Sequence, residues 1–346
     1  MHKLEYYGVR GPLLQLMTSY LSDRKFFIRY DNISSEEFHI NLGVPQGSAL
    51  GPTLFIIYVN DLLNYFSDLD IYSYADDTSI FFTGSDPDSI IPLINFELNL
   101  ITEWFNCNRL KLNTNKSVSV LFHRSRKFLE PLNAIKISED YIGWAYQVKF
   151  LGIIFSNDLR WNNHIDLLCK NLTGSFSSLR RWKGLLPSRI VFTYYYAKFF
   201  SILNYGILVY GNTSKNNIVR LLRLQKRFFR SLAPGLYDHH GWERFWRNYK
   251  IFPIDLLFTF RLATLMFRCV HKEYLSDIIV LKPFSTRYTT RSLFQFYPPI
   301  ARTDIGMSRI GHLAINYWNN LDPNIRNIPT LSHFITTLRN SIFFDN

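Results

Sequence analysis

The spacing of apolar residues in the first part of the chain alternates between helical and strand-like periods. Apolar side chains at every third or fourth position indicate an amphipathic helix, whereas short runs of β-branched and aromatic residues between turn formers indicate strands. Proline near the start of both helical stretches suits a first helical turn. In chain order, these patterns predict a helix over 11–21, a hairpin from 26–30 and 37–42 around Asp31–Asn32, and a helix over 52–66.

Two further aromatic and β-branched runs, 71–74 and 78–82, are separated by little more than Asp76 and Asp77. Runs this close in sequence predict a tight hairpin with acidic residues at its tip. The pattern beyond the hairpin predicts a helix over 89–107 and strands over 118–122 and 148–155. This alternation of strands and helices predicts a mixed α/β architecture.

The character of the chain changes after Asp158, where helical stretches rich in Arg, Lys, Tyr and Phe begin. An amphipathic stretch over 164–182 opens this half, so a domain boundary is predicted at Asp158. Arginines spaced by three and four positions predict a basic face on a packed helix, and they are Arg220, Arg223, Arg227 and Arg230. The pattern closes with an irregular segment over 285–300 and a helix over 331–343.

One apolar run, 191–211, approaches the length of a membrane span. It contains Lys198, Asn204 and several tyrosines, which a lipid-exposed helix would have to bury at a cost. The run therefore predicts a buried helix, and no membrane partner is expected.

Charge is divided unevenly along the chain. Residues 1–158 hold 13 Lys+Arg against 18 Asp+Glu and residues 159–346 hold 26 against 9, so the halves carry −5 and +17 of the net +12. A basic excess in one half is typical of a surface that binds a polyanion through counterion release. A solubilising surface explains the same charge, and charge alone leaves both interpretations open.

The three cysteines, Cys107, Cys169 and Cys269, lie far apart and form no Cys-x-x-Cys pair. This spacing favours neither a disulfide framework nor a zinc knuckle, so no disulfide partner is expected. The first ten residues are charged and aromatic where a signal peptide needs an apolar stretch. An intracellular protein is predicted, with nucleus and cytoplasm both open because no clear basic import cluster is found.

Asp76 and Asp77 are the first candidates for chemistry. Carboxylates at a hairpin tip are held by backbone pairing and face solvent, where Mg²⁺ seeks oxygen ligands. A two-metal site uses such ligands to hold the attacking and leaving oxygens of a phosphoryl transfer. Acidic residues are also ordinary turn formers, so a plain turn is the alternative. The aromatic strands on both sides, with Tyr74-Ala75 in front, favour a site.

The second candidate is GVPQGSALGP, residues 43–52. Three glycines and two prolines fix an unusual loop whose backbone can approach a planar or phosphorylated ligand, and Gln46 adds an amide that donates and accepts hydrogen bonds. The alternative is a strand-to-helix connection that needs only tight turns.

The order of these segments resembles a known family. GVPQGSALGPTLFIIYVNDL, YADDTSIFF, NRLKLNTNKS at 108–117 and FLGI at 150–153 look like motifs B, C, D and E of reverse transcriptases from non-LTR (LINE-type) retrotransposons. Residues 5–25 resemble the linker before motif B. Three later segments resemble the family's thumb and C-terminal region, namely 161–164, 224–230 and 319–338. The resemblance therefore covers nearly the whole chain.

The resemblance implies an α/β (α+β) fold, in which a partial right-hand polymerase palm without fingers precedes a helical basic thumb and a C-terminal region. It divides the chain at 1–158 for the palm, 159–250 for the thumb and 251–346 for the C-terminal region of the polyprotein. The implied activity is RNA-directed DNA polymerisation with two Mg²⁺ ions. The implied partners are an RNA template, a DNA primer and deoxynucleoside triphosphates.

The resemblance also implies roles for individual residues. Asp76 would bind metal, with Asp77 beside it in a supporting role, and Lys116 would lie near the nucleotide phosphates unless it is merely an exposed lysine. The pocket for the incoming nucleotide and template would be lined by Pro45, Gln46, Gly47 and Ser48. The primer grip would be Phe150, Leu151 and Gly152, although an apolar strand is core in almost any protein. The nucleic-acid backbone would be contacted by a basic stripe of Arg220, Arg223, Arg227 and Arg230. Such binding would be sensitive to salt and independent of sequence.

One motif of the family is not found. Motif A, whose aspartate completes the metal site, lies upstream of the segment that begins here at Met1, and Asp23 and Asp31 fall in the expected linker and hairpin turn. We therefore expect a truncated enzyme that is inactive alone, with Met1 an internal methionine or the start of a relic. A domesticated, non-catalytic nucleic-acid-binding protein is the alternative function, and an unrelated α/β protein with a structural Asp-Asp is a third.

Overall fold

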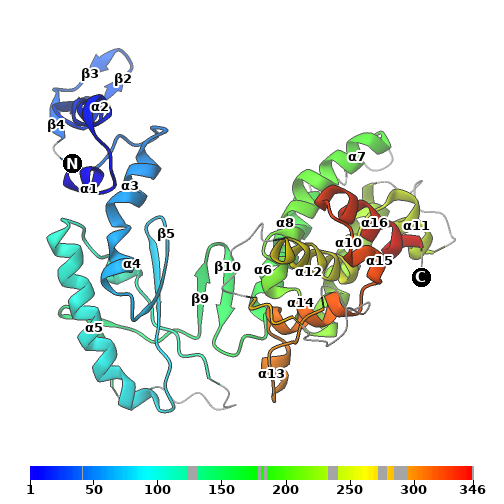
Figure 1. Ribbon diagram of the computed structural model, residues 1–346. Helices are drawn as coiled ribbons and strands as arrows, with labels where there is room; N and C mark the ends of the chain where they lie inside the picture. The colour runs from blue at the N-terminus through cyan, green and yellow to red at the C-terminus, as the bar shows by residue number, and fades with distance from the viewer. Residues whose placement is uncertain are drawn as a thin grey trace. The chain divides into compact units, whose positions relative to one another are not determined.

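The computed structural model describes residues 1–40, 42–123, 131, 133–177, 181–182, 185–232, 241–271, 279–283 and 295–344 (Figure 1). The chain forms two compact units. Unit 1 comprises Met1–Ser119 and Lys127–Trp144, and unit 2 comprises Val120–Arg126 and Ala145–Asn346. Both contain helices and paired strands, which confirms the predicted mixed α/β class. The units meet at 144/145 in sequence, whereas the predicted boundary was 158; the three-domain assignment stays a prediction.

Unit 1 begins with two helices and a pair of nested hairpins. Asp31 and Asn32 have φ values of 44° and 65°, so they turn the chain sharply between the two inner strands. The predicted helix over 11–21 and the predicted hairpin are confirmed. The elements are α1 (His2–Tyr6), α2 (Gly11–Leu21), β1 (Arg24–Phe26) paired with β4 (Phe38–Ile40), and β2 (Arg29–Tyr30) paired with β3 (Ile33–Ser34).

The next part of unit 1 packs a hairpin on helices. The helix predicted over 52–66 is two helices that meet at Asn60, namely α3 (Gly51–Val59) and α4 (Asp61–Tyr65). The predicted acidic hairpin is β5 (Asp70–Tyr74) paired with β6 (Asp77–Phe81), and the next predicted helix is α5 (Pro87–Cys107). The side chain of Asp86 accepts the Ser89 N–H at 2.9 Å and so caps α5.

A small core holds this hairpin. Ile71 of β5 and Ile80 of β6 pack against a cluster formed by α4, α5 and the residue that follows α4, whose buried members are Leu62, Phe66, Ile101 and Trp104. A second cluster joins α5 to the hairpin of β7 (Ile135–Ile137) and β8 (Asp140–Ile142), through Ile91, Ile94, Ile135 and Ile142. Unit 1 therefore holds the acidic hairpin by one face only.

The strand predicted over 118–122 is wrong. Within the described residues, this segment makes a single bridge, in which Ser119 lies parallel to Trp144. The Ser119 N–H and the Ser119 hydroxyl both donate to the Gly143 carbonyl, at 3.4 and 3.0 Å. No ladder continues from this bridge within the described residues, although Val118 and Val120 favour a strand.

The single strand predicted over 148–155 is also wrong. It is a hairpin in unit 2, made of β9 (Gln147–Phe150) and β10 (Ile153–Ser156). Leu151 and Gly152 between them have φ values of 45° and 80°, which reverse the chain. Two consecutive residues with positive φ match the right-handed twist of a two-residue hairpin.

The remainder of unit 2 is helical. The helix predicted from 164 ends at Ser177, and residues 178–180 and most of the irregular segment predicted over 285–300 lie outside the described residues. The predicted basic helix and last helix are confirmed as α10 and α16. The elements are α6 (Asn162–Ser177), α7 (Ser188–Tyr194), a π-helix (Tyr195–Phe200), α8 (Ser201–Asn204), α9 (Ile207–Tyr210), α10 (Lys215–Leu232), α11 (Trp242–Tyr249), α12 (Ile254–Val270), α13 (Asp304–Met307), α14 (Ile310–Asn319), α15 (Pro323–Arg326) and α16 (Leu331–Phe344).

The apolar run 191–211 is helical and buried along one side, as predicted, but it is broken at Gly206, whose φ is 65°. A Cβ at Gly206 would lie 2.4 Å from the end of the Ile153 side chain, so a larger residue would force that side chain to shift and would also have to adopt the positive φ. None of the described helices is both long and apolar enough to cross a membrane.

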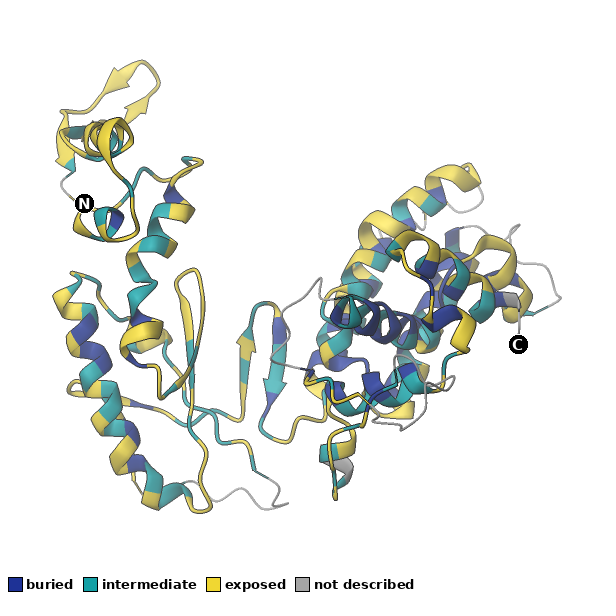
Figure 2. Ribbon diagram, viewed as in Figure 1, coloured by how far each residue is buried: buried dark blue, intermediate teal, exposed yellow. Residues whose placement is uncertain are grey.

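One hydrophobic core extends through unit 2 from α6 to α16. Its central helix is α12, which packs on α9, α10, α14 and α16 and is buried over most of its length (Figures 1 and 2). Buried residues on both sides of position 250 belong to this core, so the regions predicted as thumb and C-terminal region fold together.

Two buried polar side chains connect elements of unit 2. The Gln225 amide donates to the Tyr195 hydroxyl at 2.7 Å and to the Phe252 carbonyl at 2.8 Å, and it accepts the Ile254 N–H at 3.2 Å. The His164 ring accepts the Ile154 N–H at Nδ1, at 3.4 Å. These contacts join α10 to the π-helix and α12, and α6 to β10.

His164 gives unit 2 a dependence on pH. Burial lowers the pKa of His164 from its ordinary value of 6.5. Below that value the unfolded chain binds a proton that the folded chain excludes, so stability is present above pH 6.5 and is lost as pH falls.

We predict that wild-type protein loses of the order of 1 kcal/mol more stability than His164→Asn between about pH 7 and pH 5.5. Asparagine keeps an acceptor near the Ile154 N–H without titrating. Urea unfolding at both pH values measures the difference, and equal losses in the two proteins would contradict the assignment.

Candidate active site and nucleic-acid surface

The acidic hairpin places its two carboxylates at different positions. Tyr74 pairs with Asp77 as the last register of the ladder, so Ala75 and Asp76 form the turn and Asp77 is the first residue of β6. Ala75 has a φ of 54°, which a tight two-residue turn requires. The tip is therefore one residue earlier than the spacing of the runs indicated, and Asp77 is held by strand pairing.

The two faces of the hairpin differ in chemistry. Ile71 and Ile80 point to the small core of unit 1. On the opposite face, Asp77 shares the surface with Tyr72, Tyr74 and Phe81, which are 61%, 65% and 47% exposed. The rings of Tyr72 and Phe81 meet edge to face at 5.6 Å. Asp77 thus lies at one end of an exposed aromatic face, with Asp76 beyond it.

The carboxylate pair fits a metal only in part. Within the described residues, no group of three or more His, Cys, Asp or Glu side chains is placed to hold a metal ion. Mg²⁺ is commonly held by one or two carboxylates, with waters and substrate phosphates as its other ligands. Asp76 and Asp77 supply such a partial set of oxygen ligands.

The glycine loop is fixed at several points. Gly43 and Gly47 have φ values of 74° and 79°. The Ser48 hydroxyl accepts the Gly51 N–H at 2.9 Å, which starts α3. Arg24 donates to the Gly43 carbonyl at 2.7 Å, a support that the sequence motif did not reveal. These contacts leave Gln46 and Gly47 exposed, with Pro45 and Ser48 half-buried.

Lys116 is exposed at the end of a short 3-10 turn, Thr114–Lys116. The Thr114 hydroxyl donates to Asp140 of β8 at 2.6 Å and anchors that turn. Lys116, Gln46 and the aspartate pair all belong to unit 1. No hydrogen bond or ion pair links them to one another in the described part of the chain, so the structure does not test their common role.

The predicted primer grip, Phe150 to Gly152, is the turn of the β9–β10 hairpin in unit 2. The Tyr205 hydroxyl donates to the Leu151 carbonyl at 2.7 Å. A Cβ at Gly152 would lie 3.4 Å from the Tyr205 ring. Tyr205 follows α8 and was not singled out by sequence reasoning, because only the fold brings it to the turn.

The four predicted arginines of α10 are not equivalent. Arg220 is bound to Asp166 of α6, and this hydrogen bond raises the pKa of Arg220. Its second partner is Asn217, whose amide donates to Asn162 and Thr213, both at 2.9 Å. Arg220 therefore fastens α10 to α6.

The other end of the α10 face stacks on an aromatic ring. The Arg230 guanidinium and the Lys226 ammonium lie 5.1 and 5.7 Å from the centre of the Trp242 ring. Arg223 and Arg227 are exposed, and neither forms an ion pair with another described residue. Sequence reasoning missed Lys226 and Trp242; Lys226 could have been found from the helical spacing, whereas Trp242 could not.

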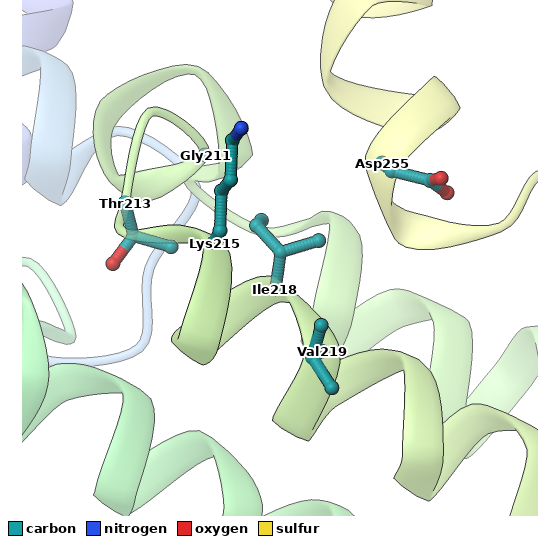
Figure 3. Close-up of a pocket in the computed structure, with 6 residues that line it drawn as sticks. All are labelled: Gly211, Thr213, Lys215, Ile218, Val219 and Asp255. Atoms are coloured by element: carbon teal, nitrogen blue, oxygen red, sulfur yellow. The ribbon is translucent and has the colours of Figure 1, made fainter.

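A hollow of about 370 Å³ lies at the first turn of α10 (Figure 3). It is lined by Gly211, Thr213, Lys215, Ile218, Val219 and Asp255. None of these residues was predicted as a site residue. Thr213 is already engaged with Asn217, so the hollow is the margin of the α9–α10 connection and adds no group to the predicted site.

Comparison with known proteins covers unit 1 and the first residues of unit 2. Residues 1–155 match the family model described as reverse transcriptase (RNA-dependent DNA polymerase). These residues belong to the reverse transcriptase family. They contain the glycine loop, the acidic hairpin, Lys116 and the β9–β10 turn.

Relatives extend the match beyond this reverse transcriptase segment. The probable RNA-directed DNA polymerase from transposon BS of Drosophila melanogaster is 29% identical over 250 residues, covering 68% of this chain and 26% of that protein. The RNA-directed DNA polymerase from mobile element jockey of Drosophila funebris is 25% identical over 233 residues, covering 64% of this chain and 25% of that protein.

A retrovirus-related Pol polyprotein from type-1 retrotransposable element R1 of Bradysia coprophila is 24% identical over 215 residues, covering 60% of this chain and 21% of that protein. The names of these relatives confirm the predicted non-LTR reverse transcriptase family. The chain spans about a quarter of the length of the curated relatives that it matches first.

The contact of Tyr205 with the β9–β10 turn can be tested by mutation. We predict that Tyr205→Phe lowers the free energy of unfolding by about 1 kcal/mol, because the Leu151 carbonyl loses its donor. Tyr249→Phe is the control, since its hydroxyl bonds to no other described residue. Urea unfolding compares the variants, and hydrogen exchange at the Ile153 amide shows whether the turn loosens; equal behaviour of both variants would rule out the support.

Proposed function

We propose that this chain is the nucleotide-joining part of an RNA-directed DNA polymerase from a non-LTR retrotransposon. It would extend a DNA primer on an RNA template with deoxynucleoside triphosphates. The observation that carries the proposal is the Asp76–Asp77 pair on a tight hairpin inside the segment that belongs to the reverse transcriptase family. A structural turn gives no reason for the exposed aromatic face beside the carboxylates.

In this proposal, unit 1 acts as a polymerase palm. Gln46 and Gly47, with Pro45 and Ser48 behind them, contact the base pair between template and incoming nucleotide. Lys116 acts on the nucleotide phosphates. The turn at Leu151 positions the primer end, because Tyr205 and the two positive φ values fix its shape.

The helices of unit 2 act as a thumb on the primer and template. Arg223 and Arg227 contact successive phosphates, and Arg230 reaches the same backbone from its place on Trp242. Such contacts are independent of sequence and weaken with salt. Arg220, on the same side of α10, forms an ion pair with Asp166 of α6 and so helps to fix α10 in place.

Asp76 and Asp77 would hold Mg²⁺ together with the nucleotide phosphates. When bound, the ions would stabilise the charge that develops on the phosphoryl group. The described residues provide two carboxylates and no third ligand in reach, so we propose that the chain by itself extends primers poorly. The surrounding residues would orient the nucleotide whether or not a complete metal site is present.

The decisive test is a chimera in which this chain replaces the region of the jockey polymerase that it matches. We predict Mg²⁺-dependent extension of a DNA primer on an RNA template, and a loss of about 10²–10⁴-fold with Asp76→Asn. The control is Asp70→Asn at the far end of β5, opposite Phe81, which should extend normally. A folded chimera that binds primer and template but extends nothing would sink the proposal.

The metal can be examined in the unaltered chain. We predict that Mn²⁺, a paramagnetic substitute for Mg²⁺, binds weakly alone and at least about tenfold more tightly with a deoxynucleoside triphosphate, since the phosphates supply the missing ligands. Electron paramagnetic resonance of free Mn²⁺ measures this, with Asp76→Asn/Asp77→Asn as the negative control. Tight nucleotide-independent binding would show that the described carboxylate pair is not the whole site.

A further inference from the structure

Three arginines outside the predicted site lie close together in unit 2. Arg261 and Arg268 are seven positions apart on α12, so they lie on one face of that helix, about 10.5 Å apart along its axis. Arg339 belongs to α16, which packs on α12. We name Arg261, Arg268 and Arg339 the arginine cluster.

Among the described residues, Arg261 and Arg339 contact neutral groups. Arg261 Nε donates to the Asn204 side-chain oxygen at 2.8 Å. The Arg339 guanidinium lies over the Phe252 ring at 5.4 Å, and Phe252 stacks on Phe260 at 4.4 Å, next to Arg261 in sequence. These contacts fix the positions of two guanidinium groups, and no described acidic side chain forms an ion pair with either of them.

In the part of the chain that the structure describes, the elements around the cluster add cations and almost no anions. The π-helix carries Lys198, and α16 contains no Asp or Glu. The one carboxylate of α12 is Asp255 in its first turn, which is rotated about 120° around the helix from Arg261. Burial lowers the pKa of Arg261, and the nearby Arg268 and Arg339 lower it further. Among the described residues, no anion offsets the charges of Arg261 and Arg339, and two such cations close together are unfavourable without one.

An exposed aromatic ring lies beside the cluster. Tyr196 of the π-helix is 46% exposed. Arg339 is close enough to lower the pKa of Tyr196, although burial raises it more. Cations that follow a phosphate backbone next to an aromatic ring on which bases stack are the pattern of surfaces that bind single-stranded nucleic acid.

We propose that the arginine cluster and Tyr196 form a second binding surface for single-stranded nucleic acid, separate from the basic face of α10. Three cations spread over two helices suit a ligand with several phosphates in a row better than a single small anion. Because bases can stack on the neighbouring Tyr196 ring, a nucleic acid suits this surface better than other polyanions do.

The two surfaces cannot be one continuous patch around α10. Arg223 and Arg227 lie about 160° around α10 from Gln225. Gln225 is fully buried and bonds to the Phe252 carbonyl, and Arg339 lies on the ring of the same Phe252. The buried layer of Gln225 and Phe252 therefore separates the α10 face from the arginine cluster, so unit 2 can hold two strands at once.

The test counts binding sites on the full-length chain, without Mg²⁺ or nucleotide. The probe is a single-stranded RNA of about 10 nucleotides, within the range of ~4–16 that one such surface covers. We expect two RNA molecules per wild-type chain. One is expected for Arg261→Gln/Arg339→Gln, one for Arg223→Gln/Arg227→Gln, and two for the control pair Lys282→Gln/Arg302→Gln, which removes two exposed cations elsewhere in unit 2.

A charge-preserving double variant distinguishes an effect of lost charge from an effect of lost folding. Arg261→Lys/Arg339→Lys keeps both charges and should bind two RNA molecules with nearly wild-type affinity. In the glutamine pair, the slope of log affinity against log salt, summed over both sites, should fall by at least about 1.4, for two phosphate contacts at ~0.7 each. Circular dichroism and urea unfolding check that each variant is folded.

Three results would overturn the proposal. One RNA per wild-type chain would mean a single surface, and unchanged binding by the folded glutamine pair would mean that the cluster does not contact RNA. Cluster-dependent binding to vesicles of anionic lipid, without cluster-dependent binding of RNA, would identify a membrane ligand instead. Because none of these measurements involves primer extension, they stand apart from the proposed polymerase activity.

Discussion

The buried amide of Gln225 is the interaction on which the helical unit depends. It satisfies the Tyr195 hydroxyl, the Phe252 carbonyl and the Ile254 N–H in one place, at the junction of three elements. An apolar side chain of similar size would leave all three groups unsatisfied in a dry core, which is costly. The residue therefore sets both the rotation of α10 and the start of α12. That rotation decides which arginines face outward.

A comparable constraint acts on the acidic hairpin, which is held from one side only. Ile71 and Ile80 fix it to the small core of unit 1, and strand pairing does the rest. The opposite face keeps its carboxylates and aromatic rings available. The metal-binding chemistry proposed for it requires oxygen atoms that no protein cation neutralises, and neither aspartate forms an ion pair within the described residues. The exposure of this face leaves the carboxylates open to the proposed metal. The same exposure means that the hairpin is packed on one side only.

Local patterns predicted the elements whose causes are local. The turn at Asp31–Asn32 and the hairpin around Asp76 were both predicted from residues within a few positions, and the cap at Asp86 that begins α5 is also local. The β9–β10 turn was missed because Leu151 is an unusual residue for a positive φ, and its support comes from Tyr205. The segment around Ser119 pairs with Trp144 at one residue only, and a partner strand so distant in sequence is not visible in local propensity. The ion pair of Arg220 with Asp166 likewise depends on how α6 and α10 pack.

The bond from Tyr205 to the Leu151 carbonyl spans 54 residues of sequence. During synthesis from the N-terminus, the chain reaches the β9–β10 turn long before Tyr205 is made, and the intervening α6 and π-helix must pack before the hydroxyl can arrive. The strands alone can pair early, but their turn acquires its final support only when the helical unit assembles. A segment that ends at residue 155 would contain the four sequence motifs and still lack the contact that shapes the last of them.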